Sequence, residues 1–432
     1  MPLENSGPRE PLQTRPLPEA EMLEGTPPVV LAGSKMSTSA NGYRALFGLL
    51  ASYAFLTTGN GLLTTLIPIR MLHSNMSTLA VGIVQSCYYA GFILGAVVNR
   101  TLIERIGQHR TFVAYASFVA VIALGFVTFN APLMLALLRL LCGFAFVGLY
   151  TAVESWLNSA VPNAFRGRVV GSYLSVHYLA LGAGQFFLTA GDAEGNHQLL
   201  IVAALFCAAV IPVTLMNGWP VQISIRQLNE PRSLVSMETV RHINRTTALA
   251  IPGCILTGSL YGSFYAMAPV FLTRIGFSVN ELSTFMGIAL VGALVPQWPM
   301  GRLSDRVDRR RLIRCIALAS ALLSGLLIFF HAHAFVCCVL FAYVVVTFPL
   351  YGLIVSHVND CTEPDRRVAT SVTLQILLAL GGASGPAFGS IAMIALGPGG
   401  LFVLDCASSM ALAYVAIRTM KSSSDSPRES PS

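Results

Sequence analysis

The amino-acid sequence predicts an all-α membrane protein with twelve transmembrane helices in two similar six-helix bundles. Of its 432 residues, 54% are hydrophobic and only 11% are charged, whereas a soluble domain usually has about a quarter charged residues. The charges gather in short clusters, and the apolar stretches between them are roughly 20 residues long, the length of a helix that crosses a bilayer. The third observation is an internal repeat at an offset of 201 residues.

Two tails flank the apolar part of the chain. Residues 1–43 are rich in proline and glutamate and have no apolar run of signal-peptide length, so we expect a disordered cytoplasmic tail. Met36, shortly before the first apolar stretch, stays open as an alternative start. Residues 420–432, rich in serine and proline, are expected to form a second cytoplasmic tail.

Between the tails the chain divides into two bundles. The N-terminal bundle (residues 44–216) and the C-terminal bundle (248–419) are separated by a basic cytoplasmic loop, 217–247. Each span must be helical, because the lipid core offers backbone amides no hydrogen-bond partner. The expected spans are 45–69, 79–98, 111–129, 133–157, 169–190, 198–216, 248–272, 282–300, 312–330, 334–357, 369–393 and 400–418.

Basic residues lie almost entirely on one side of the predicted membrane. With the N-terminus inside, the inner loops hold seventeen arginines and the outer loops hold two, Arg70 and Arg274. Basic loops are retained in the cytoplasm during insertion, so both termini are expected there, at a cell membrane such as the bacterial inner membrane. The formal net charge of +7 belongs to these loops, and nucleic-acid binding is not expected. The nine scattered cysteines contain no CxxC pair, so we expect neither a metal site nor a cofactor.

The two halves repeat each other without a gap. Gly61 matches Gly262 and Pro68 matches Pro269 at the common offset of 201 residues. Later landmarks keep the register: Leu149-Tyr150 with Leu350-Tyr351, Arg166 with Arg367, and Gly184 with Gly385. Because each half has an even number of spans, both have the same orientation, and such repeats place a binding site near the midplane between the halves.

Several motifs resemble those of the major facilitator superfamily. The loop after the eighth span is similar to the signature Gly-x-Leu-x-Asp-Arg-x-Gly-Arg-Arg/Lys, and it reads Gly301-Arg302-Leu303-Ser304-Asp305-Arg306-Val307-Asp308-Arg309-Arg310-Arg311. Asp308 stands in place of the second glycine of the signature, and this change is expected to weaken a tight turn. A degenerate copy runs from Arg100 to Arg110 in the first half. Further matches are Arg139-x-x-x-Gly143 and Gly381-x-x-x-Gly385-Pro386-x-x-Gly389. The segment from Gln297 to Leu303, together with Val153-Glu154-Ser155, looks like the YcaD-type subgroup.

Polar side chains within the spans are candidates for binding or coupling. Arg139 lies six residues into the fourth span, roughly 9 Å deep, where a charge is expected to face a cavity, although its long stem would also let it reach the interface. His177 lies mid-span and is a candidate for proton coupling, because histidine changes charge near neutral pH; a packing role is the simpler interpretation. The resemblance places spans one, four, seven and ten on a cavity, and the remaining candidates are Asn60, Gln85, Tyr150, Tyr261, Tyr265 and Tyr351.

Charged residues at the inner surface are candidates for a cytoplasmic gate. The resemblance implies that acids such as Asp305 and Glu104 pair there with arginines or helix ends, and Glu154 is expected to pair with Arg105, Arg110 or Arg166. Proton transfer by Glu154, and arginines that only fix the orientation, are the alternatives. The gate candidates are Glu104, Arg105, Arg110, Glu154, Arg166, Gly301, Arg302, Asp305, Arg306 and Arg309.

Other residues are assigned to packing or to the interface. Gly91 and Gly95, and Gly381 and Gly385 with Pro386, are expected to allow close helix contact, since glycines four residues apart share a helix face. Asp405, near the outer end of the last span, is expected at the membrane interface.

The resemblance implies a secondary active transporter that moves a small solute through the lipid bilayer by alternating access, as a monomer. Whether protons drive it, and whether it performs uptake or efflux, stay open. A membrane receptor or scaffold on the same fold is the first alternative. A membrane-embedded enzyme is the second, and the sequence contains no HExxH, no GxSxG and no paired carboxylates within the spans.

Overall fold

The computed structural model describes residues 40–160, 166–190, 195–216, 237–363 and 366–424. The predicted tails therefore lie almost entirely outside the described residues. The helices of the first half are α1 (Ala40–His73), α2 (Thr78–Ile106), α3 (Gln108–Thr128), α4 (Pro132–Ala160), α5 (Arg166–Phe186), η2 (Phe187–Thr189) and α6 (His197–Thr214). Those that follow are α7 (Met237–Thr246), α8 (Ala250–Arg274), α9 (Val279–Gly292), α10 (Gln297–Ser304), α11 (Arg309–Phe329), α12 (His333–Thr347), α13 (Leu350–Asp360), α14 (Arg367–Leu396) and α15 (Gly400–Ser424).

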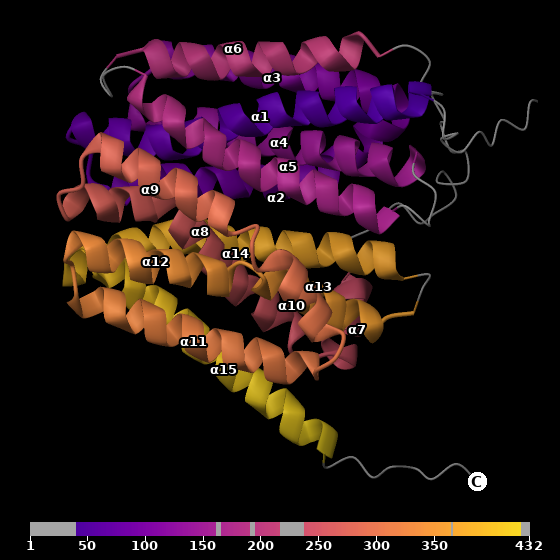
Figure 1. The fold of residues 1–432 in the computed structure, drawn as a ribbon, viewed down its shortest axis with the longest axis vertical. Helices are drawn as coiled ribbons and strands as arrows, with labels where there is room; N and C mark the ends of the chain where they lie inside the picture. The colour runs from indigo at the N-terminus through magenta and orange to yellow at the C-terminus, as the bar shows by residue number, and fades with distance from the viewer. Residues whose placement is uncertain (1–39, 161–165, 191–194, 217–236, 364–365, 425–432) are drawn as a thin grey trace, which may run out of the picture.

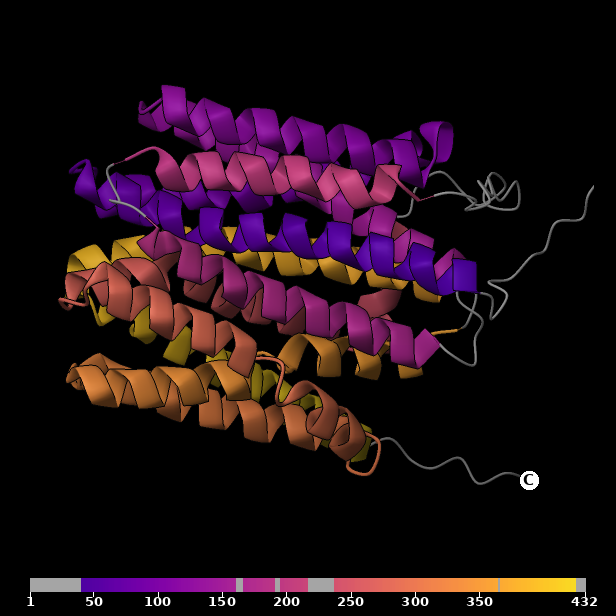
Figure 2. The same cartoon turned by 45° about the horizontal axis from the view of Figure 1, so that its top comes forward.

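Eleven segments of the described chain are long and apolar enough to cross a membrane, which agrees with the predicted all-α membrane fold. The helix α5, expected as the fifth span, has the length of a span but not its composition. It packs along α1 of its own half and α9 of the other, as Figure 2 shows. A helix between protein neighbours meets less lipid, which explains why α5 carries Ser175, His177 and Gln185.

Two spans are broken into two helices each. The eighth is divided into α9 and α10, with Pro296 as the N-cap of α10, and the tenth into α12 and α13, with Pro349 as the N-cap of α13. Proline has no amide proton and its ring clashes with the preceding turn, so both breaks fall at prolines. In the central loop, where no helix was predicted, α7 packs on the C-terminal half through the buried Ile243.

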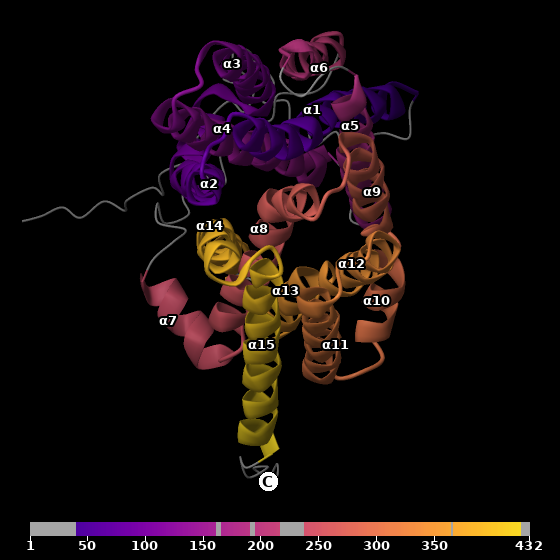
Figure 3. The same ribbon diagram turned by 90° about the vertical axis from the view of Figure 1, so that its left-hand side faces the viewer.

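The two halves form separate layers, with α1 to α6 in one and α8 to α15 in the other (Figure 1). Viewed along the helices, α14 lies against α2 and α9 lies against α5 (Figure 3). The start of α1 and the end of α15 lie at the same end of the molecule, on the right in Figure 1, which we call the tail end. The opposite end is the far end.

The sequence repeat reappears as repeated contacts between helices. A Cβ atom on Gly61 of α1 would lie 2.5 Å from the carbonyl oxygen of Leu181 in α5, and one on Gly262 of α8 would lie 2.3 Å from that of Gly382 in α14. The reciprocal contacts keep the same offset, at 2.2 Å for Gly184 on Thr58 and 2.4 Å for Gly385 on Ser259. Small residues therefore bring the first and fifth spans of each half into backbone contact.

Hydrogen bonds join the halves near the far end and the middle. Arg274 donates to Thr78 at 2.8 Å. Nearer the middle, Ser283 donates to the carbonyl oxygen of Gln185 and Ser86 to that of Ala383, both at 2.6 Å. These contacts hold the far end of the molecule closed.

Candidate functional site

A cavity of about 220 Å³ lies between the two halves. Its walls come from α1, α2, α4 and α5 on one side and from α8, α9, α13 and α14 on the other. The structure brings to it all eight side chains named from the sequence as substrate or coupling candidates: Asn60, Gln85, Arg139, Tyr150, His177, Tyr261, Tyr265 and Tyr351.

Aromatic rings form much of the cavity wall. Tyr88, Tyr89 and Phe92 of α2 line it together with four of the tyrosines just named. Tyr261 stacks on Phe348 at a centroid distance of 4.8 Å, and its hydroxyl donates to the carbonyl oxygen of Phe348, where the tenth span is broken. Such rings offer flat apolar faces with polar edges, which suits a planar solute.

Three amide side chains in the wall have an atom without a hydrogen-bond partner. They are Asn60 at Oδ1, Gln85 at Nε2 and Gln185 at Oε1, and all three atoms are buried. The other amide atom is engaged in two of them: Asn60 donates to the Tyr150 hydroxyl at 3.2 Å, and Gln185 to the carbonyl oxygen of Gly61 at 2.8 Å. A buried unpaired polar atom costs about 1–3 kcal/mol, so a bound polar solute would relieve this cost.

Arg139 is the only charged side chain among the described residues that line the cavity. It is 1% exposed, so it does not reach the membrane interface in this conformation. Its Nη2 donates to the carbonyl oxygens of Leu63 at 3.2 Å and Thr64 at 3.4 Å. Thr64 lies four residues before Pro68, which has no amide proton to give that carbonyl. The guanidinium therefore compensates for the donor that Pro68 lacks.

The chain that forms this cavity matches a known protein family. The model of the Major Facilitator Superfamily matches residues 49–386, more than half of the chain. The chain belongs to the Major Facilitator Superfamily. It is therefore a multi-pass transmembrane transporter of a family that does not consist of enzymes, which confirms the resemblance found in its motifs.

Individual relatives of this transporter cover most of it. The MFS-type transporter YcaD of Escherichia fergusonii is 25% identical over 382 residues, which is 88% of this chain and 97% of that protein. The YcaD protein of Salmonella typhi is 24% identical over 377 residues, 87% of this chain and 96% of that protein. These relatives are of the subgroup that the segment from Gln297 to Leu303 and Val153-Glu154-Ser155 indicated.

Solved structures show the same fold at low sequence identity. The nucleoside transporter NupG superposes with a TM-score of 0.74 and 13% identity, over 87% of this chain and 99% of that one. A bacterial homologue of the human lysosomal transporter Spinster, in an inward-facing and unoccupied conformation, gives a TM-score of 0.67 and 13% identity, over 90% and 96% of the two chains.

Among the described residues, Glu154 of this transporter pairs with neither Arg105 nor Arg110, two of its three expected partners. Its Oε1 accepts a hydrogen bond from Tyr173 of α5 at 3.3 Å, and it takes part in none of the ion pairs found among the described residues. It lies six residues before the end of α4, roughly 9 Å along the helix, whereas Arg105 and Arg110 are exposed at helix ends. The side chain of Arg166 lies outside the described residues.

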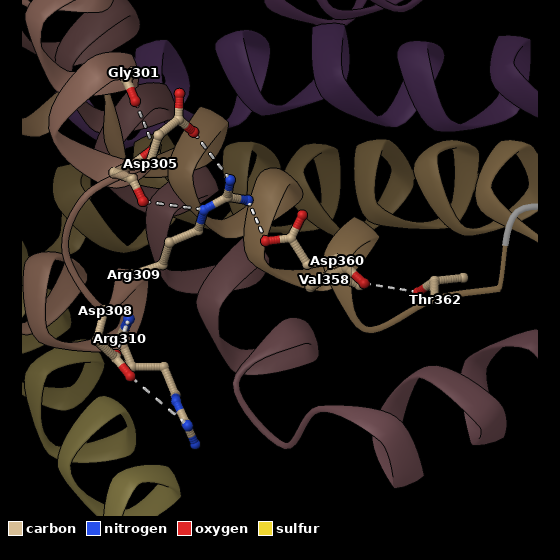
Figure 4. A network of polar contacts seen from close by, with 9 residues as sticks. Gly301, Asp305, Asp308, Arg309, Arg310, Val358, Asp360 and Thr362 are labelled. Carbon is tan, nitrogen blue, oxygen red and sulfur yellow. Dashed lines mark hydrogen bonds and ion pairs between the residues drawn. The ribbon is translucent and has the colours of Figure 1, made fainter.

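The predicted gate acid Asp305 joins a cluster within the second half (Figure 4). Its Oδ1 lies 3.3 Å from Arg309, which also binds Asp360 Oδ2 at 2.7 Å. The cluster ties the end of α10 to α11 and α13 and does not bridge the two halves. Of the other gate candidates, Gly301, Arg302 and Arg306 are exposed, Arg302 stacks on Trp298, and Glu104 lies in the last turn of α2.

Asp308 does not weaken the loop that contains it, contrary to expectation. Its side chain accepts the amides of Arg310 at 2.9 Å and Arg311 at 3.1 Å and so caps α11. Its φ is −53°, which suits any residue, whereas the matching Gly107 has a φ of 84°. Only the first-half loop needs a glycine at this position.

The packing glycines lie against backbone atoms of neighbouring helices. A Cβ on Gly91 would lie 1.8 Å from the carbonyl oxygen of Leu140, and one on Gly95 would lie 2.6 Å from that of Phe144. In the second half, a Cβ on Gly381 would lie 1.9 Å from the carbonyl oxygen of Ile255. The carbonyl of Pro386 reaches across the halves to Gly82.

Asp405 is not at the membrane interface, where it was expected. It is 1% exposed and accepts a hydrogen bond from the Tyr343 hydroxyl at 3.1 Å. The helix α15 packs on α8 and α11, and this position faces the interior of the bundle. Asp405 lies outside the residues that line the cavity.

Several residues at the cavity were not predicted from the sequence. Gln185, Gln375, Tyr88 and Tyr89 line the cavity, and Tyr53 lies behind it with its hydroxyl 2.7 Å from His177 Nδ1. A signal was available for the two glutamines, because an amide inside an apolar span needs an internal partner. No such signal marks the tyrosines, which are also common at membrane interfaces.

Proposed function

We propose that this transporter carries a small, neutral, planar solute with hydrogen-bonding edges across the cell membrane by alternating access. The observation that carries the proposal is the cavity between the halves, which combines tyrosine rings with three unpaired amide atoms. A planar heterocycle can stack on the rings while its edge pairs with the amides.

The single cation argues for a neutral solute. Arg139 is the only charge among the described lining residues. Its Nη2 already donates to two carbonyls of α1, and its Nε is a further buried donor without a partner. Recognition of an anion usually uses both arms of a free guanidinium, and recognition of a cation would need an acid in the wall. Nucleosides fit the cavity chemistry, and NupG, which has a similar fold, is a nucleoside transporter. Uridine and adenosine are therefore suitable first probes.

The arginine bias supports cytoplasmic termini, so we propose that the tail end faces the cytoplasm. The hydrogen bonds between the halves then close the outer side, and the conformation described is inward-facing. In alternating access the opposite closure must also form, with the tail ends of α4, α5, α10 and α13 approaching one another.

The binding role of the cavity is tested by removing an amide that has an unpaired atom. Gln85→Leu is expected to lower uridine or adenosine affinity about tenfold, because one buried hydrogen bond to the solute is lost. Binding is measured by isothermal calorimetry on the purified protein, and flux by counterflow of the radioactive solute in proteoliposomes. Gln108→Leu is the matched control, since Gln108 donates to Ser155 outside the cavity.

Three outcomes separate the candidate functions. Flux that falls with Gln85→Leu and not with Gln108→Leu supports the transporter. Binding without flux in the unmodified protein would favour a receptor. Neither binding nor flux for neutral heterocycles, together with flux of a charged solute, would contradict the proposed solute class.

The proposed closure of the tail end gives a second test. Asp305→Asn is expected to raise the labelling rate of a cysteine placed at Tyr351, if Asp305 helps to hold the closed form. Stability should hardly change, because the Asp305 side chain is 71% exposed and exposed ion pairs contribute about 0–1 kcal/mol. Glu363→Gln is the control, because it removes a carboxylate of similar exposure, 69%, from a pair with Arg366. An unchanged labelling rate in an Asp305→Asn protein that inserts normally would count against the latch.

A further inference from the structure

Four side chains of the first half form one continuous hydrogen-bond chain that begins at the cavity. His177 lines the cavity, and its Nδ1 lies 2.7 Å from the Tyr53 hydroxyl. That hydroxyl donates to the hydroxyl of Tyr173 at 3.1 Å, which donates to Glu154 Oε1 at 3.3 Å. The chain crosses α5, α1 and α4 and runs from the cavity toward the tail end.

The burial of the chain suits a conducting path. Its two middle members are buried, with Tyr53 0% and Tyr173 9% exposed, whereas His177 is partly exposed and Glu154 is exposed. The rings of Tyr53 and Tyr173 stack with their centroids 4.7 Å apart, and the centroid of the His177 ring lies 6.0 Å from that of Tyr53. This packing fixes the positions of the hydroxyls. Both ends of the chain are thus more accessible than its middle, which the surrounding helices shield.

We propose that His177, Tyr53, Tyr173 and Glu154 form a proton relay between the cavity and the tail end, which couples solute transport to proton movement. The relay rests on the transport function proposed above. It also gives Glu154 a different task from the expected ion pair, and it adds two tyrosines that the sequence did not single out.

The hydrogen-bond directions define the transfer. Tyr53 donates onward to Tyr173, so it accepts from His177, which then has its proton on Nδ1 and a free Nε2. A proton from the cavity binds to Nε2, and the Nδ1 proton passes to the Tyr53 oxygen. Tyr53 passes its own proton to Tyr173, which passes its proton to the Glu154 carboxylate. Each hydroxyl loses one proton and gains another, so one proton moves from the cavity to Glu154.

Among the described residues, few other groups that titrate near neutral pH lie close to His177 or Glu154. The ring centroid of His177 lies 6.1 Å from that of Tyr150 and 5.4 Å from that of Tyr178. The helix α9 contributes Met286 and Leu290 to the same cavity. The wall opposite contains Tyr261, Tyr265 and Tyr351, with Arg139 as the one cation among the described lining residues. Beside Glu154, α3 places Gln108 on Ser155 and His109 on Trp156, and Arg105 and Arg110 lie exposed at the ends of α2 and α3.

The first test needs no solute. Full-length protein with ¹⁵N-labelled histidine, in lipid nanodiscs, reports by NMR which nitrogen of His177 carries the proton; loss of the signal in His177→Asn identifies it. The relay places the proton on Nδ1. In Glu154→Gln the amide can donate to Tyr173 and reverse the chain, so the proton is expected to move to Nε2. Tyr53→Phe and Tyr173→Phe are expected to change the balance of the two forms as well.

A matched variant controls for loss of a buried hydroxyl. Tyr115→Phe removes a hydroxyl that donates to Asn99 in the same half, outside the cavity and the relay, and should leave the His177 signal unchanged. A His177 signal that is also unchanged in Glu154→Gln, Tyr53→Phe and Tyr173→Phe would overturn the relay.

The second test separates coupling from transport. Counterflow of ³H-uridine or ³H-adenosine at equal pH needs no net proton transfer, whereas accumulation driven by a pH gradient does. Tyr53→Phe and Tyr173→Phe are expected to lose accumulation by about tenfold or more, as for other lost proton-transfer groups, and to keep counterflow. Equal effects on both activities would contradict the coupling role. Absence of counterflow in the unmodified protein would instead contradict the proposed function, and the NMR result then decides the relay alone.

Discussion

Arg139→Lys is expected to insert and fold but to lose most transport. Lysine keeps the charge, yet it is a flexible point charge and cannot reproduce the planar arrangement of guanidinium donors. The Nη2 bonds to Leu63 and Thr64, at 3.2 and 3.4 Å, would be lost or replaced by one bond. A hydrogen bond from a charged group contributes about 1.5–3 kcal/mol, so the initial transport rate should fall about tenfold or more. The measurement is initial flux per mole of inserted protein.

Pro68 supplies a control that separates two explanations of this loss. If Arg139 serves only the carbonyl of Thr64, Pro68→Ala restores the missing amide donor, and the double variant Pro68→Ala with Arg139→Lys should recover transport. If the guanidinium also faces the solute in the cavity, the double variant stays inactive. Near-normal flux in Arg139→Lys alone would remove Arg139 from the site.

Gly91→Ala and Gly143→Ala are expected to prevent folding or to lower the melting temperature severely. In both, the added Cβ would lie 1.8 Å from a backbone carbonyl oxygen, of Leu140 and of Tyr88 respectively. A helix backbone cannot move aside as a side chain can, so the cost should exceed the 1–3 kcal/mol of ordinary overpacking, at about 3 kcal/mol or more. Thermal unfolding of the purified protein in detergent measures the change.

Gly325→Ala is the matched control for these glycines. Gly325 lies within α11, and a Cβ there would meet no atom within 4 Å. Alanine is favoured over glycine inside a helix by about 1 kcal/mol, so the melting temperature should stay the same or rise. A Gly91→Ala protein as stable as the unmodified one would show that α2 and α4 do not depend on this contact.

Features set by the membrane could be predicted from the sequence. Apolar length and arginine clusters define helices such as Gln108–Thr128 and Pro132–Ala160 to within a few residues, because lipid constrains the backbone so strongly. Candidates such as Asn60, Tyr150 and Tyr261 line one cavity, since they are polar groups that a helix bundle turns away from lipid.

Features set by helix rotation and side-chain contact could not be predicted. Glu154 was expected to pair with an arginine at the inner surface. In the structure, the face of α4 that carries Glu154 is turned toward Tyr173 of α5. Asp405 was placed by its depth along the last span, and depth does not tell which face of α15 it occupies. The breaks at Pro296 and Pro349 differ from the continuous helix at Pro68, although all three residues are prolines within predicted spans.

The compensated proline in α1 makes the two halves mechanically unequal. Pro269 of α8 occupies the position that matches Pro68, but the position that matches Arg139 is Leu340, a buried hydrocarbon side chain with no donor to offer. A guanidinium from α4 thus supports the first helix of one half, whereas no arginine among the described residues donates to the corresponding helix of the other half. Under the same applied force, α8 should bend more readily at its proline than α1. The two halves around the shared cavity therefore differ in stiffness, although their sequences repeat each other.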